Sequence, residues 1–241
     1  MNKEISTCIQ ARLSSKRLPG KMLMKIQDKT VIQFLFDRLK KSKLCNSHIL
    51  ATTNKSIDNE LETIALENNF SCFRGSENDV LARVCNALNL FKPKIVVEIC
   101  GDCPFIDPFL IDYGIKTFLE KKPDVLFCGY YKQWYPIGTD FAIYDTQTIL
   151  EVEKNTQNVE QREHTSLFFL QNKKKFKIIN LENHPSLKFP ELRLVLDYPE
   201  DLLFINKIYK EIKKNDFGTK DVIDLVKKKS FLMEINKKIK N

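Results

Sequence analysis

Short apolar runs alternate with helical patterns through the first 130 residues, and this alternation limits the possible folds more than any other feature of the chain. The clearest run is Lys94–Cys100 (KIVVEIC), whose uninterrupted apolar character is typical of a strand covered on both faces. Strands that alternate with helices favour a parallel sheet with helices on both sides. We therefore predict an α/β fold with a mostly parallel central sheet. Four further strands are predicted over Ile5–Ile9, His48–Thr52, Ser71–Phe73 and Asp124–Cys128.

Helix signals lie between these runs. Thr30–Lys43 carries apolar residues at the i, i+3, i+4, i+7 spacing of one helix face. Asp107 before Pro108 is typical of an N-cap followed by the first helical position, so a helix is expected to run from there to about Leu119. Two more helices are expected to open at Ser56 and at Ser76.

The second half of the chain is less regular, and no linker divides it from the first. We predict one domain over residues 1–241 with a lysine-rich helical tail from about residue 206 to 241. Strands are predicted over Gly138–Tyr144, Lys175–Asn180 and Arg193–Asp197, and a loop over His184–Glu191. Helices are predicted over Glu160–Gln171, from Pro199 onward and over Thr219–Lys229.

The net charge of +8 invites a nucleic-acid interpretation, but its distribution argues against it. Residues 206–241 hold eleven Lys and five acidic residues, so this segment alone carries +6 and the first 205 residues only +2. A lysine-rich segment of this kind is typical of a solvated face. The chain also lacks an aromatic-rich basic motif that would read bases. We predict no nucleic-acid partner.

Cysteine usage and the lack of long apolar runs indicate a cytoplasmic protein. Seven Cys at irregular spacing, without a secretory signal, suggest reduced thiols. No run approaches the roughly 18 apolar residues of a membrane span. Cys100 and Cys103 form a C-x-x-C pair, but a zinc or redox interpretation lacks the second pair or helix start that it needs. We predict cytoplasmic localisation and no membrane span.

The first predicted strand leads into a basic loop, Ala11–Lys21, with four basic residues, two hydroxyls and one Gly. Ligands of open α/β sheets bind beyond the carboxyl ends of the strands, where this loop begins. Cations and hydroxyls suit a polyphosphate because each contact is a charge-assisted hydrogen bond. The spacing matches neither the Walker nor the dinucleotide-binding fingerprint, which disfavours an ATPase and a dehydrogenase. A solvated basic loop remains the alternative on composition alone.

Two aspartates far apart in the chain are candidate metal ligands. Asp102 follows the strand Lys94–Cys100, and Asp197 follows the strand that begins at Arg193. If these strands are parallel neighbours, both carboxylates face one crevice, where water and phosphate oxygens would complete a Mg²⁺ site. The alternative for Asp197 is a residue that stabilises a helix start. Gly101 would allow the backbone to approach a ligand closely.

The stretch Ile9–Lys21 (IQARLSSKRLPGK) resembles the nucleotide-binding signature of the cytidylyltransferases that make CMP-activated acidic sugars. These include the 3-deoxy-manno-octulosonate and N-acylneuraminate enzymes, and the chain is most similar to the spore-coat-polysaccharide branch. Six further matches occur in the family's order at Ala51–Thr53, Phe73–Leu81, Gly101–Pro104, Gly138–Asp140, Arg162–His164 and Asp197–Asp201.

The resemblance implies an α/β/α sandwich of the nucleotide-diphospho-sugar transferase type. It also implies Mg²⁺-dependent transfer of CMP from CTP to a small acidic sugar-like acceptor, with release of pyrophosphate, in surface polysaccharide or glycan biosynthesis. Members of the family often form homodimers, and the sequence does not decide the oligomeric state. The Gln that octulosonate enzymes carry before Gly-Asp is replaced by Cys100, which disfavours octulosonate as the acceptor.

The resemblance also implies roles for individual residues. Asp102 and Asp197 would hold the magnesium, and Arg12 and Lys21 would act with them in catalysis by holding the phosphates. The nucleotide-binding set is expected to be Gln10, Ala11, Arg12, Ser14, Ser15, Arg17, Lys21, Thr52, Arg74 and Gly101. On the substrate side we expect Asp140, Arg162 and His164.

Three other functions stay open. A glycosyltransferase that consumes a nucleotide sugar would share the sheet and an acidic metal site, but the basic loop argues for a triphosphate. A non-catalytic nucleotide-binding protein would not need the pair of aspartates. A nucleic-acid binder would show binding that falls steeply with salt. UTP or GTP in place of CTP is not excluded by the sequence.

Overall fold

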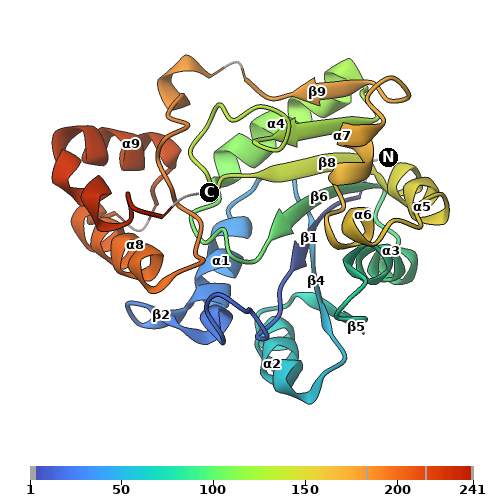
Figure 1. Cartoon of the computed structure of the whole chain (residues 1–241), viewed down its shortest axis with the longest axis horizontal. Coiled ribbons are helices and arrows are strands. Elements are labelled where there is room, and N and C mark those ends of the chain that lie inside the picture. The colour runs from blue at the N-terminus through green and yellow to red at the C-terminus, as the bar shows by residue number, and fades with distance from the viewer. Residues whose placement is uncertain (1–3, 183, 215, 240–241) are drawn as a thin grey trace.

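The computed structural model describes residues 4–182, 184–214 and 216–239, and a seven-stranded sheet forms its centre (Figure 1). The strand order is β5-β4-β1-β6-β8-β7-β9, and a two-stranded ribbon of β2 and β3 lies outside it. The central strands are β1 Ile5–Gln10, β4 Ser47–Thr53, β5 Ser71–Gly75, β6 Ile95–Cys100, β7 Val125–Cys128, β8 Phe141–Asp145 and β9 Ile178–Asn180. The ribbon strands are β2 Lys25–Ile26 and β3 Lys29–Thr30.

Helices cover both faces of this sheet. Along β6, Ile95, Val97 and Ile99 join one buried apolar cluster and Val96 joins another, as the alternation of side chains across a strand requires. Helices α1, α2, α4, α8 and α9 contribute to the first cluster, and α3, α5 and α7 to the second. The helices are α1 Val31–Leu39, α2 Asn59–Glu67, α3 Val80–Phe91, α4 Pro108–Lys121, α5 Thr146–Lys154, α6 Val159–Glu163, α7 Leu167–Gln171, α8 Pro199–Ile212 and α9 Thr219–Lys228.

The three-layer α/β/α fold with a mostly parallel sheet is thus confirmed. Strand β8 is the exception, because it pairs antiparallel with both β6 and β7. The pairs β1–β4, β1–β6, β4–β5 and β7–β9 are parallel. In the described part of the chain, no helix has the length and apolar character that crossing a membrane requires.

Several predicted elements have different bounds in the structure. Helix α1 ends at Leu39 rather than Lys43, and Ser56 begins a short 3₁₀ turn instead of capping a helix. The cap of α3 is Asp79, whose side chain accepts from the Ala82 backbone N–H, so the prediction that Ser76 opens this helix was wrong. The predicted helix Glu160–Gln171 is two short helices, α6 and α7. Helix α5 was not predicted.

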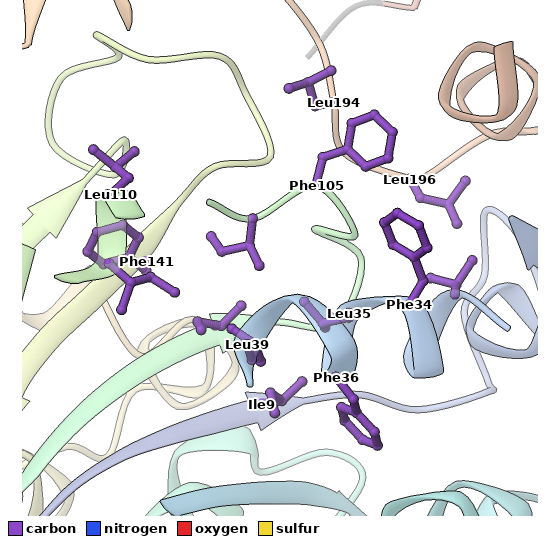
Figure 2. Close-up of a cluster of buried hydrophobic side chains, with 14 of the residues drawn as sticks. Ile9, Phe34, Leu35, Phe36, Leu39, Phe105, Leu110, Phe141, Leu194 and Leu196 are labelled. Carbon is purple, nitrogen blue, oxygen red and sulfur yellow. The ribbon is translucent and has the colours of Figure 1, made fainter. Parts of the chain in front are cut away.

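The segment Arg193–Asp197 is extended but is not a strand, which corrects the prediction. Its one β-bridge joins Arg193 to Ile137, and Leu194 N–H donates to the Ile137 carbonyl at 2.7 Å. Leu194 and Leu196 are fully buried beside Phe105 and Phe34 (Figure 2). The alternating pattern therefore reflects burial of these leucines against the core. It does not reflect membership of the sheet.

The C-terminal lysine-rich segment packs on the core through its apolar residues. Val222, Ile223 and Val226 of α9 are buried, and so is Leu232 in the 3₁₀ turn Ser230–Ile235. These side chains belong to the cluster that also contains Ile9 of the central sheet. Helices α8 and α9 lie side by side at one end of the molecule, drawn in orange and red in Figure 1.

Asp201, in the first turn of α8, fixes the segment that precedes this helix. Its fully buried carboxylate accepts from Arg193 Nε at 3.0 Å and from the backbone N–H groups of Asp197 at 3.0 Å and Tyr198 at 3.1 Å. The side-chain amide of Asn236 donates to the same carboxylate at 3.0 Å. A buried carboxylate with this many donors is well compensated.

We expect Asp201→Ala to lower the free energy of unfolding by about 3–5 kcal/mol, because it leaves the buried Arg193 guanidinium without its main partner. Denaturant unfolding followed by circular dichroism measures the change. Asp224→Ala removes an exposed i,i+4 pair with Lys220 and should cost less than about 0.5 kcal/mol. Equal losses in the two variants would contradict the role assigned to Asp201.

Candidate active site

Two adjoining cavities open beyond the carboxyl ends of β1 and β6. The first has a volume of about 410 Å³ and the second about 650 Å³. Strand β1 lies between β4 and β6, so the chain crosses to opposite sides of β1 here, and this is the point where open α/β sheets bind ligands. Arg17, Cys100 and Asp102 line both cavities. Asp102 therefore stands at the border between the two cavities.

The ammonium group of Lys21 bridges the two predicted metal ligands. Its Nζ lies 2.7 Å from Asp102 Oδ2 and 3.0 Å from Asp197 Oδ1, and it also donates to the Leu196 carbonyl at 2.9 Å. Burial disfavours the charged form of Lys21. The charges and hydrogen bonds of both carboxylates outweigh burial and raise the pKa of Lys21 above its usual value. The sequence prediction that Asp102, Asp197 and the basic loop meet agrees with this geometry.

Asp197 interacts with two further cations. Arg17 Nη2 lies 2.7 Å from its Oδ1, and Arg193 Nη2 lies 3.1 Å from its Oδ2. A backbone hydrogen bond from Leu196 N–H to the Asp102 carbonyl, at 2.8 Å, holds this segment against the end of β6. Asp197 therefore does not follow a strand of the sheet. The backbone hydrogen bond of Leu196 and the ion pairs of the Asp197 carboxylate hold it in the site.

Gly101 allows the ends of β6 and β1 to approach each other. A Cβ atom there would lie 2.8 Å from the Ala11 Cβ and 3.0 Å from the Gln10 carbonyl oxygen. Gly101 N–H donates to that same carbonyl at 2.8 Å. Gly101 is therefore required for the close approach of two strand ends. Because it also lines the first cavity, its close approach to a ligand stays a prediction.

The residues present fit a divalent cation. One cationic atom, Lys21 Nζ, already reaches both Asp102 and Asp197, so a single ion has access to two hard oxygen donors of the kind that Mg²⁺ prefers. The described residues contain no group of three or more potential metal ligands. A magnesium ion here would therefore take its remaining ligands from water and from phosphate oxygens.

The basic loop forms one wall of the first cavity. Arg12 Nη1 donates to the Glu77 carbonyl at 3.1 Å, and the Ser14 hydroxyl donates to the Glu77 carboxylate, so Glu77 anchors the loop. The Ser14 side chain is used in this contact and does not line the cavity. The predicted nucleotide-binding residues that do line it are Gln10, Ala11, Arg12, Ser15, Arg17, Lys21 and Gly101.

Thr52 and Arg74 do not reach either cavity. Thr52 is fully buried in β4. The guanidinium of Arg74 pairs with Glu62 at 2.9 Å and donates to Asn59 and to the Thr53 and Lys55 carbonyls. These contacts tie β5 to α2 and leave this side chain away from the site, so the structure gives no support to a nucleotide contact for either residue.

Arg162 also lies outside both cavities. Its Nε is 2.8 Å from Asp79 and its Nη2 is 2.7 Å from Glu153, so it joins α6 to the start of α3 and to α5. The expectation that Arg162 binds the acidic substrate is therefore not supported by its position. His164 is exposed and lines the first cavity rather than the second.

Asp140 lines the second cavity. Gly138 N–H donates to its carboxylate at 2.8 Å, and Gln133 Nε2 lies 3.4 Å from it. The left-handed Gly129 allows this packing, because a Cβ there would lie 1.7 Å from Asp140 Oδ1. Burial raises the pKa of Asp140 to about 6, while these donors oppose the rise.

Sequence reasoning missed several residues of the site. Arg83 of α3 lines the first cavity, and Tyr130 and Gln133 line the second. Arg83 gives no signal because a basic residue within a helical pattern is usually solvated.

Cys100 and Cys103 also line the second cavity. Burial raises the pKa of both thiols and so favours their protonated form. A protonated thiol is a poor metal ligand and a poor nucleophile, so the structure does not favour a zinc or redox role for this pair.

The raised pKa of Asp140 predicts a pH-dependent stability in protein free of metal and nucleotide. The folded state binds the carboxyl proton of Asp140 more tightly than the unfolded state does. Protonated Asp140 therefore contributes to the free energy of unfolding, fully below about pH 4, and this contribution is lost as the pH rises to about 6. We expect the unfolding free energy of wild type minus that of Asp140→Asn to fall across this window. Denaturant unfolding at each pH measures it, with Asp224→Asn as the surface control. A flat difference would contradict the assignment.

Comparisons with known proteins agree with this architecture. A cytidylyltransferase family model matches residues 7–238. The spore coat polysaccharide biosynthesis protein SpsF of Bacillus subtilis is 28% identical over 229 residues, 92% of this chain and 94% of that protein. A 3-deoxy-manno-octulosonate cytidylyltransferase of Solibacter usitatus is 34% identical over 127 residues, 52% of this chain and 49% of the relative.

The structural similarity extends over the whole fold. A solved cytidylyltransferase from Leptospira borgpetersenii superposes with a TM-score of 0.92 at 29% identity and covers 99% of both chains. The family match begins within β1 and ends beyond α9, so it includes the basic loop and both aspartates at the border of the cavities. On this evidence the chain belongs to the cytidylyltransferase family.

Proposed function

We propose that the protein is a Mg²⁺-dependent cytidylyltransferase that transfers CMP from CTP to a small acidic sugar-like acceptor and releases pyrophosphate. The observation that carries this proposal is the position of Asp102, which borders both cavities and shares one cation with Asp197. A group that reaches two cavities at once can act where a nucleotide and an acceptor meet. The name of SpsF supports a role in surface polysaccharide biosynthesis.

The first cavity suits the triphosphate. Arg12, Lys16, Arg17 and Lys21 come from one loop and place four positive charges along its wall. Arg presents a planar fork of donors and Lys a point charge, and both pair well with phosphate oxygens. Arg12 and Lys21 would hold the β- and γ-phosphates, and Lys21 would exchange part of its contact with Asp102 and Asp197 for contact with phosphate oxygens.

The reaction needs positioning and charge compensation rather than a protein nucleophile. An acceptor oxygen attacks the α-phosphorus, the new O–P bond forms, and the bond from the α-phosphorus to the bridging oxygen breaks as pyrophosphate leaves. Arg12 and Lys21 would stabilise the negative charge that grows on the leaving group. Asp102 and Asp197 would hold Mg²⁺, which supplies charge neutralisation and polarisation at the phosphate when it is bound.

The second cavity suits the acceptor. Arg17, whose side chain is 55% exposed, stands at its border and can pair with the carboxylate of an acidic sugar. Asp140, Gln133 and Tyr130 line the same space and offer hydrogen-bonding groups for sugar hydroxyls. We therefore assign to Arg17 the recognition of an acidic acceptor that we had expected of Arg162.

A pyrophosphate-release assay tests this proposal directly. Each of the four nucleoside triphosphates is combined with a panel of acidic sugars, including 2-keto-3-deoxy acids, in the presence of Mg²⁺. We expect release with CTP and at least one acidic acceptor, and none when the acceptor is left out. No release with CTP across the panel, or turnover of a nucleotide sugar instead, would contradict the proposal.

Removing either carboxylate should abolish most of the turnover. We expect Asp102→Asn and Asp197→Asn each to lower kcat at least about 100-fold at limiting Mg²⁺, because an amide oxygen is a much weaker ligand for the ion. Asp224→Asn, on the exposed face of α9, should keep the wild-type rate. Thermal unfolding checks that each variant is folded. Turnover near the wild-type rate in both active-site variants would refute the metal assignment.

A further inference from the structure

The ammonium group of Lys21 uses all of its hydrogen-bond donors within the site. An ammonium group has three N–H donors. In Lys21 they are directed to Asp102 Oδ2 at 2.7 Å, to Asp197 Oδ1 at 3.0 Å and to the Leu196 carbonyl at 2.9 Å. The Lys21 side chain is also almost fully buried. Lys21 can therefore contact a further anion only by giving up one of these three partners.

A metal ion and the Lys21 ammonium group compete for the same carboxylate oxygens. Mg²⁺ binds its oxygen ligands at about 2.0–2.1 Å, which is shorter than either carboxylate contact of Lys21 Nζ. An ion bound to both Asp102 Oδ2 and Asp197 Oδ1 must therefore lie between them, in the space that Nζ occupies. The other oxygen of Asp197, Oδ2, lies 3.1 Å from Arg193 Nη2 and so faces a different cation.

The charges around the two aspartates balance one another among the described residues. One network of ion pairs joins the cations Lys21, Arg17 and Arg193 to the carboxylates of Asp102, Asp197 and Asp201. Its three positive and three negative charges cancel. A divalent ion that entered alone would add positive charge without a counter-charge, whereas a triphosphate would bring the negative charge that the ion needs.

A triphosphate is also the ligand that can move Lys21. Lys21 and Asp102 both line the first cavity, so phosphate oxygens there compete with the carboxylates for the ammonium group. The flexible four-carbon stem of lysine allows this group to change partners. The backbone of the loop stays anchored, because Gly20 N–H donates to the Leu13 carbonyl at 2.9 Å. Movement of the side chain alone is therefore sufficient.

We propose that Lys21 is a built-in counter-ion that occupies the metal position between Asp102 and Asp197 and excludes a divalent ion until a triphosphate competes for its ammonium group. This inference rests on the proposed function, because it takes the two aspartates as metal ligands and a nucleoside triphosphate as the bound nucleotide. It adds an order of events: the metal ion binds both aspartates only together with, or after, the nucleotide.

Binding of Mn²⁺ to the nucleotide-free full chain, followed by electron paramagnetic resonance, tests the exclusion. Lys21→Met keeps an apolar stem and removes the ammonium group. We expect this variant to bind Mn²⁺ at least about 10-fold more tightly than wild type, because a binding-competent state that is rarely populated lowers apparent affinity in proportion. Lys16→Met is the matched control, since Lys16 lines the same cavity but is exposed and pairs with no carboxylate of the described residues. It should change the affinity less than about 3-fold, because salt screens an exposed charge.

Two further variants locate the ion and guard against misfolding. The double variant Lys21→Met with Asp102→Asn should lose the added Mn²⁺ affinity. Mn²⁺ should also raise the Tm of Lys21→Met more than that of wild type, because a ligand that binds the folded state stabilises it. If Lys21→Met does not fold, Lys21→Gln takes its place in both measurements, since its amide can still donate to a carboxylate but carries no charge.

Equal Mn²⁺ affinity in wild type and in the Lys21 variant would overturn this inference, because Lys21 would then exclude nothing. Added affinity that persists in the double variant would overturn it as well, because the ion would then bind elsewhere.

A second measurement separates this inference from the proposed function. In equilibrium dialysis with CTP, we expect wild-type protein to retain Mn²⁺ that it does not retain without CTP. If Lys21→Met gains Mn²⁺ affinity but wild type retains no Mn²⁺ with CTP, Lys21 excludes the ion as inferred and the pairing of metal with CTP in the proposed function fails. If wild type retains Mn²⁺ equally with and without CTP, this inference fails and the metal assignment stands.

Discussion

A single buried ammonium group, Lys21 Nζ, joins the three chain segments that make the site. It contacts Asp102 at the end of β6 and Asp197 before α8, and it comes from the loop that follows β1. Removing one partner of a buried ion pair is strongly destabilising, because the other charge is left uncompensated. The charges that the proposed chemistry requires are therefore the same charges that hold these segments together in the empty protein.

The sheet explains why these segments meet. Because β1 lies between β4 and β6, its carboxyl end opens a crevice, and the strand ends can approach closely only because Gly101 lacks a side chain. The crevice divides into a cavity walled by loop cations and a cavity that holds Asp140. In the proposed reaction, nucleotide and acceptor occupy one cavity each and meet at Asp102.

Local sequence patterns predict the elements of this fold well and their environment less well. Period-2 and period-3.6 patterns come from burial within one element, so β6, α4 and α8 could be predicted. The direction of β8 depends on its partners, and the segment Arg193–Asp197 shows a strand pattern because its leucines meet the core. Such features depend on tertiary contacts.

The same limit applies to the site. The basic loop and Asp102 could be predicted because both follow strands, whose ends commonly carry functional residues. Asp197 was predicted at the end of a strand that the structure lacks, and its role was also implied by the family resemblance. Arg74 and Arg162 looked equally suitable, but nearby carboxylates engage both. Arg83 could not be found, because only the structure shows that this helical arginine is buried and that no carboxylate of the described residues pairs with it.

The central claim is that Asp102 and Asp197 hold one divalent ion beside the triphosphate. A crystal structure with CTP and Mn²⁺ in place of Mg²⁺, with anomalous scattering recorded at the manganese edge, tests this claim most directly. The account predicts a peak bound by carboxylate oxygens of both aspartates and by a phosphate oxygen. A peak that contacts neither aspartate, with Lys21 still bridging the two carboxylates, would contradict it.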